Sequence, residues 1–171
     1  MANTGKYVGI TGGVLQEELA INTTAGAADA NKIIKTDSSG LLAATMLPVG
    51  VGPEVVTITA SEAIAAGAYV NIWNSTGLKV RNADATVAGK EAVGFSLLGA
   101  SNAASCVVYL SSQTNTAASG RAIGAKQFLS TTPGTSQETA PAASGNVVQQ
   151  LGFATSATSV LFEPLQAITL A

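Results

Sequence analysis

Apolar and polar residues alternate most clearly from residue 54 onward, where short apolar runs recur between turn-forming residues. In AYVNIWN (68–74), Val70 and Ile72 fall on one face of an extended chain, and Tyr69 and Trp73 fall on the other. A two-residue period is typical of an antiparallel strand with one buried and one solvated face. The pattern predicts strands in EVVTIT (54–59), AYVNIWN (68–74), LKVRNA (78–83), EAVGFSLL (91–98), ASCVVYLSS (104–112), KQFLST (126–131), NVVQQLGFATS (146–156) and SVLFEPL (159–165).

Turn signals separate these runs. NSTG (74–77) is expected to join two strands as a hairpin turn, with Gly77 at a positive φ. TTPGT (131–135) has the proline and glycine of a type II turn, at Pro133 and Gly134. Many short strands separated by turns indicate an all-β fold, either a small antiparallel barrel or a sandwich.

Helical signals are weak by comparison. GVLQEELA (13–20) and ASEAIAAGA (60–68) each predict a short helical stretch, and in the first of these Leu15 and Leu19 lie four residues apart. No longer segment shows the 3.6-residue period of an amphipathic helix. Helices are therefore expected to be a minor part of the fold.

The first 53 residues differ from the rest of the chain. TTAGAADAN (23–31) is a link of small and polar residues, and VGVGP (49–53) is a glycine–proline link that indicates a boundary near residue 53. We therefore expect an extended N-terminal arm over 1–53 and a β-barrel or sandwich domain over 54–171. The arm alone has too few apolar residues for an independent core, so it should lie on its own domain or on a neighbouring subunit.

The apolar part of the arm is KIIKTDSSGLLAATMLP (32–48). Its two ends are expected to form a hairpin around a short loop in which Gly40 has a positive φ, and a helical turn over 41–46 is the alternative. A two-stranded hairpin is only marginally stable alone, so this one should dock on a partner surface. Its apolar side chains either contact that partner or cover the base of their own β-domain. The candidate contact residues are Ile33, Ile34, Leu41, Leu42 and Leu47.

Charge is sparse, since 8 basic and 10 acidic residues give a net charge of −2. Nucleic-acid binding depends largely on phosphate neutralisation, so no nucleic-acid partner is expected, and the pair Lys79 and Arg81 is interpreted as surface charge. No segment approaches the roughly 20 apolar residues of a membrane span. The start MANTGKYVGITGG has neither the basic nor the apolar part of a signal peptide. We expect no membrane partner and no export by that route.

Residues that carry most enzyme chemistry are scarce. The chain has no histidine and one cysteine, so it lacks the usual general base and the donors of a tetrahedral zinc site. Cys106, in the apolar run SCVVYL, is expected to be a small buried residue. Asp29, Asp37 and Asp84 occur in turn-like contexts, where aspartate accepts hydrogen bonds from nearby backbone. No catalytic residue, metal ligand or cofactor is predicted.

The remaining classes of function are structural and binding roles. A mean hydropathy of +0.36 without a membrane segment indicates apolar surface that one subunit does not bury. Such surface usually marks partner sites. We therefore expect a symmetric homo-oligomer, with a trimer favoured over a dimer, whose arm crosses to a neighbour.

Three segments also carry a resemblance to known proteins. They are TITASEAIAAGAYVNIWNSTGLKVRNADATVAGKEAVGFSL (57–97), KQFLSTTPG (126–134) and NVVQQLGFATSATSVLFEP (146–164). In this order they resemble the small capsid decoration, or cement, proteins of bacteriophages and related phage head and tail-fibre-associated proteins. KIIKTDSSGLLAATMLP (32–48) resembles a segment that precedes such domains in phage structural proteins.

The resemblance implies a β-rich, non-enzymatic protein without a cofactor, placed many times on the outer surface of a virion capsid. Such a protein is made in the host cytoplasm, bridges neighbouring subunits of the major capsid protein and stabilises the expanded shell. The same segments leave a second possibility open, a tail-fibre or tail-tip component that contacts a host receptor. A hydrolase or isomerase of unfamiliar type is a third, and it would require a pocket with convergent carboxylates.

Overall fold

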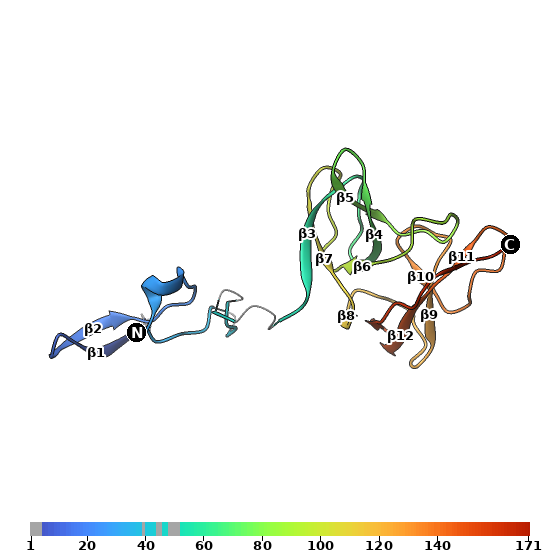
Figure 1. Ribbon diagram of the computed structural model, residues 1–171. Coiled ribbons are helices and arrows are strands. Elements are labelled where there is room, and N and C mark those ends of the chain that lie inside the picture. Colours follow the sequence, from blue (N-terminus) through green and yellow to red (C-terminus); the bar gives the residue numbers. More distant parts are fainter. Residues whose placement is uncertain (1–4, 39, 44–45, 48–51) are drawn as a thin grey trace. The chain divides into compact units, whose positions relative to one another are not determined.

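The computed structural model describes residues 5–38, 40–43, 46–47 and 52–171 (Figure 1). The chain divides into two compact units, Met1–Gly52 and Pro53–Ala171. The predicted all-β fold class is confirmed, because the longest helix in the described residues is the 3-10 turn η1 (Gly26–Asp29). No described helix has the length and apolar character to cross a membrane. The strands are β1 (Lys6–Thr11), β2 (Val14–Leu19), β3 (Val55–Ala60), β4 (Ala68–Asn74), β5 (Leu78–Asn82), β6 (Gly94–Ser96), β7 (Ser105–Tyr109), β8 (Gln113–Asn115), β9 (Lys126–Leu129), β10 (Ser136–Gln137), β11 (Val147–Val148), β12 (Gln150–Ser156), β13 (Ser159–Phe162) and β14 (Ile168–Thr169).

The first unit begins with a hairpin in which β1 pairs antiparallel with β2 (Figure 1). Gly12 and Gly13 form its two-residue turn, with φ angles of 61° and 83°. A turn with positive φ at both central positions follows the twist of the flanking strands, and glycine adopts it without steric cost. The predicted helical stretch over 13–20 is wrong, because cross-strand pairing beside this turn outweighs the weak spacing of Leu15 and Leu19.

The hairpin predicted over 32–48 is wrong for the part of that segment that the structure describes. No strand occurs there, and Ile34 instead forms an isolated parallel bridge with Ile21. Lys35 donates its backbone N–H to the Ile21 carbonyl at 2.8 Å, so this stretch is paired with the chain that follows β2. The first of the two predicted strands therefore pairs with a different neighbour.

A turn does lie at the predicted loop. Gly40 has a φ of 77°, and the Asp37 N–H donates to the Leu41 carbonyl at 2.8 Å. Asp37 Oδ1 accepts the Leu41 N–H at 3.0 Å, so the aspartate side chain closes the turn locally. In the alternative helical turn over 41–46, Met46 donates to the Ala43 carbonyl at 2.9 Å, and residues 44 and 45 lie outside the described residues.

The second unit contains a closed barrel. Within residues 52–171, all of which are described, the strand order around it is β3-β5-β4-β6-β7 (Figure 1). β3 and β5 pair in parallel and the other neighbours are antiparallel. The predicted NSTG turn between β4 and β5 is confirmed, since Asn74 Oδ1 accepts the Gly77 N–H at 3.1 Å and Gly77 has a φ of 107°. Small and branched residues fill the barrel: Ile58, Ala60, Ile64, Ala68, Val70, Val80, Cys106 and Val108.

A second sheet in the same unit has the order β10-β9-β12-β13-β8, and β11 pairs with β14. The predicted turn at 131–135 lies between β9 and β10, with a φ of 76° at Gly134 and a 3.1 Å hydrogen bond from Ser130 N–H to the Thr135 carbonyl. A second core unites residues from the barrel strands with residues from this sheet. Its members are Tyr69, Ala83, Ala85, Ala92, Phe95, Leu129, Leu151 and Phe162.

Two predictions for the segment around β4 are wrong. The expected helix over 60–68 is replaced by the end of β3, an isolated bridge from Ile64 to Ala100, and a turn at Gly67 with a φ of 76°. The expected solvated face of β4 is also buried at its start. Val70 belongs to the barrel core and Tyr69 to the second core, because the barrel wall is covered on its outer side.

Candidate functional site

The hairpin of the first unit has one mainly apolar face. The register pairs Val8 with Glu17 and Ile10 with Leu15, and Leu19 lies two positions beyond Glu17. Alternate and directly paired positions share a face of a two-stranded ribbon, so Val8, Ile10, Leu15 and Leu19 lie together. We call these four residues the hairpin face. Their exposed fractions are 68%, 74%, 71% and 59%.

Polar contacts across the hairpin do not compensate for this exposure. Lys6 Nζ lies 3.1 Å from Glu17 Oε2 across the hairpin face, and both side chains are largely exposed. On the opposite face, the Tyr7 hydroxyl donates to Glu18 Oε2 at 3.0 Å. Exposed ion pairs contribute at most about 1 kcal/mol, whereas burial of one large aliphatic side chain contributes about 1.5–3 kcal/mol. Covering the hairpin face would therefore stabilise it far more than its own polar contacts do.

The five residues predicted from the sequence as partner contacts lie further along the same unit. Leu47 is half-buried, and the other four are exposed to 48–64%. Their role as contacts stays a prediction. The hairpin face was missed, although its signal was present: Gly12 and Gly13 lie between two runs that each contain exposed aliphatic residues.

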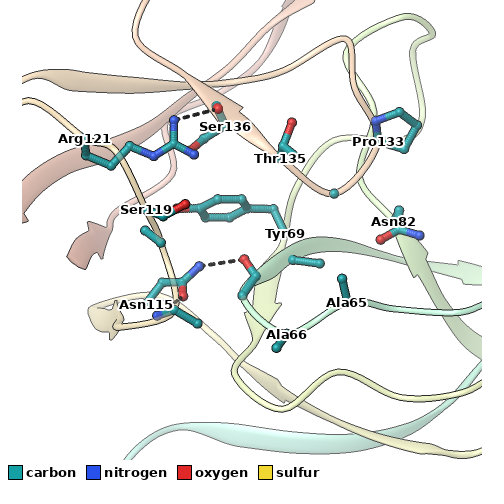
Figure 2. A pocket seen from close by; sticks show the side chains of 15 residues that line it. Ala65, Ala66, Tyr69, Asn82, Asn115, Ser119, Arg121, Pro133, Thr135 and Ser136 are labelled. Carbon is teal, nitrogen blue, oxygen red and sulfur yellow. Dashed lines mark hydrogen bonds between the residues drawn. The ribbon is translucent and has the colours of Figure 1, made fainter. Parts of the chain in front are cut away.

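A second candidate site is a pocket of about 210 Å³ in the second unit (Figure 2). Its floor is built from the small residues before β4, and its walls include Asn115, Ser119, Arg121 and the turn at Pro133 and Gly134. Asn115 is fully buried and donates through Nδ2 to the Gly67 carbonyl at 2.9 Å, which ties the β8 end of the second sheet to the start of the barrel strand.

Tyr69 lies across this pocket, and its ring extends from β4 toward Ser119 and Arg121 (Figure 2). The residue is only 2% exposed, and its hydroxyl has no hydrogen-bond partner among the described residues. Burial raises the pKa of the Tyr69 hydroxyl, and the nearby Ser136 and Asn115 side chains and the Arg121 charge offset that effect only in part. The site thus holds a neutral phenol at physiological pH.

Tyr69→Phe is expected to leave the free energy of unfolding unchanged or to raise it by about 1 kcal/mol. A buried hydroxyl without a partner carries a desolvation cost that phenylalanine does not have. Chemical denaturation of both proteins at pH 7, followed by the fluorescence of the single Trp73, measures the difference. A loss above about 1.5 kcal/mol, the upper end for an ordinary hydrogen bond, would show that the hydroxyl is bonded in the folded protein.

Tyr69→Phe should also change how the stability of the protein depends on pH above about 10. Because the folded pKa of Tyr69 lies above its ordinary value of 10.0, the unfolded chain loses this proton first as pH rises. The wild-type protein therefore loses stability from this group above about pH 10, and Tyr69→Phe should lose less over the same range. Equal slopes of stability against pH for the two proteins would contradict the burial of the phenol.

The acidic residues in turns serve the backbone, as predicted. Asp29 Oδ2 accepts the Ala25 N–H at 2.6 Å, and Asp84 Oδ1 accepts the Thr86 N–H at 2.8 Å. Cys106 is buried in the barrel core, also as predicted. Among the residues that the structure describes, no group of three or more His, Cys, Asp or Glu could hold a metal ion.

Comparison of the chain with models of known protein families and with curated proteins gave no match. The fold and the two sites described above are therefore the basis for assigning a function.

Proposed function

We propose that this chain is a structural protein of a bacteriophage virion that decorates the capsid and stabilises it by bridging neighbouring major capsid subunits. The observation that carries the proposal is the exposure of large aliphatic side chains in the first unit. They occur in the hairpin face and again over 33–42. A small unit with so much exposed apolar surface is typical of a docking element.

The second unit supports the proposal in a different way. The barrel has a core of its own and shares a second buried core with the second sheet, so this unit can fold around its own apolar interior. It would act as the body that the first unit attaches to the shell. The ordered resemblance of 57–97, 126–134 and 146–164 to phage decoration proteins points to the same role.

In the proposed mechanism, preferential binding to the assembled shell stabilises that shell. A protein that binds the assembled shell but not its separated subunits stabilises the shell in proportion to the binding free energy. When a homo-oligomer presents several first units together, weak contacts combine into strong attachment, because the second contact forms at a high effective concentration. Chemical catalysis has no part in this role.

The decisive experiment is a count of copies in the virus particle. An electron-microscopy map of the native virion should locate the chain on the outer capsid surface, repeated at many equivalent positions. A handful of copies at the tail would instead establish the tail-fibre or tail-tip role and overturn the proposal.

The oligomeric state gives an independent test. Native mass measurement of the full chain at micromolar concentration should show a homotrimer, or a dimer as the next expectation, because a closed symmetric assembly would cover part of the exposed aliphatic surface. A stable monomer under these conditions would contradict the predicted self-association.

A further inference from the structure

The Tyr69 pocket contains hydrogen-bond donors for which the protein provides no acceptor. Arg121 donates through Nη1 to the Ser136 carbonyl at 2.9 Å. Its Nε is buried and unpartnered, and no hydrogen bond joins Nη2 to any described residue. The Tyr69 hydroxyl is buried and unpartnered on the same side, and Figure 2 shows the guanidinium near the hydroxyl end of the ring.

Arg121 also has no ion-pair partner among the described residues. Arg121 is the only charged residue among those that line the pocket. No carboxylate of the described residues lies within ion-pair distance of it, and the nearby Glu138 is engaged through Oε1 with the Ala122 N–H at 2.7 Å. A half-buried guanidinium without a counter-ion is unusual, because charge removed from water is normally paired.

We propose that the pocket binds a carboxylate group, which pairs with the Nε and Nη2 edge of Arg121 and accepts a hydrogen bond from Tyr69. Nε and Nη2 form the adjacent pair of donors that meets both oxygens of a carboxylate. The pocket volume of about 210 Å³ admits a small carboxylic acid or one acidic side chain. This inference does not depend on the proposed role in the virion.

The test is an NMR titration of the full isotope-labelled chain, in which the Arg121 Nε–H resonance reports binding directly. Acetate serves as the free carboxylate and N-acetyl-glutamate amide as the mimic of a protein side chain. We expect saturable shifts of Arg121 and of the Ser119 and Ser136 amides, with a Kd of the order of 1 mM, the range that suits so few ligand atoms. Tighter binding of acetate would indicate a free acid as the ligand, and tighter binding of the blocked glutamate would indicate a partner protein.

Matched controls decide the chemistry. N-acetyl-glutamine amide has the same shape without the charge and should produce no saturable shift. Inorganic phosphate at equal ionic strength should bind more weakly than acetate, because phosphate carries up to two negative charges near pH 7 and Arg121 is the one charged residue that lines the pocket. Equal shifts from the amide, or equal binding of phosphate, would overturn the assignment of a carboxylate site.

Two variants locate the site. Arg121→Gln should weaken acetate binding at least tenfold, whereas Lys126→Gln, which removes a positive charge elsewhere in the second unit, should leave it unchanged. Tyr69→Phe, which keeps the ring and the packing, should weaken acetate binding three- to tenfold. This variant tests the site even if Arg121→Gln does not fold. Wild-type affinity in both site variants would overturn the proposal.

Discussion

A variant with threonine at all four positions of the hairpin face, Val8, Ile10, Leu15 and Leu19, is expected under the proposed capsid-decorating role to bind expanded shells at least about a hundredfold more weakly than wild type. A hundredfold loss corresponds to about 2.7 kcal/mol. Docking would bury these four aliphatic side chains, at about 1.5–3 kcal/mol each when fully covered, so their loss would exceed that value even if burial were partial. Threonine is chosen because its β-branched side chain favours strands and should preserve the hairpin.

The measurement is cosedimentation of the labelled protein with shells that have been stripped of it, over a range of protein concentrations. Val14→Thr is the matched control, because Val14 is 60% exposed but lies on the opposite face of the hairpin, paired with Thr11. It should change the affinity less than threefold. Wild-type binding by the fourfold variant would show that the hairpin face is not the contact.

A second fourfold variant separates the hairpin face from the contacts predicted over 33–42. It carries threonine at Ile33, Ile34, Leu41 and Leu42, which are exposed to a similar extent. A loss of binding in this variant alone would assign docking to these residues instead. Losses in both variants would make the whole first unit the contact surface.

The second large effect concerns the core of the second unit. Phe95→Ala is expected to lower the free energy of unfolding by about 3–5 kcal/mol, a large share of the 5–15 kcal/mol typical of a domain. Phe95 is fully buried, and its ring stacks on Tyr109 at a centroid distance of 5.4 Å and meets the edge of Phe162 at 5.7 Å. Alanine would leave a cavity between the barrel and the second sheet.

Phe153→Ala is the control, because Phe153 is 40% exposed on β12 and belongs to neither core. It should cost at most about 1.5 kcal/mol, the value of partial apolar burial. Urea denaturation with Trp73 fluorescence and far-ultraviolet circular dichroism compares the two variants. Similar losses in both would show that the second core is not the main source of stability in this unit.

Much of the second unit could be predicted from local sequence. The structure contains a strand within each run predicted from residue 54 onward, because a two-residue period and the turn chemistry of NSTG and TTPGT act over a few residues. The first unit was predicted less well. The sequence predicted a hairpin over 32–48, whereas the hairpin of this unit is formed by β1 and β2 around the Gly12–Gly13 turn. At the expected hairpin loop, the side chain of Asp37 closes a local turn instead.

The Tyr69 pocket could not be predicted from the sequence alone. Tyr69 and Arg121 are far apart in the chain and meet only because β8 and the turn after β9 are brought against the start of β4. No local pattern shows which donors remain without acceptors, since that depends on every group that folds around them.

The sequence alone determined the all-β class, the turns of the second unit, the buried Cys106 and the scarcity of catalytic side chains, because these follow from residue type and from spacing over a few positions. The tertiary structure decided that the strands divide into a closed barrel and a second sheet and that β4 is buried on both sides. Those features depend on which distant segments meet, and contacts between distant segments are not encoded in any short stretch of the chain.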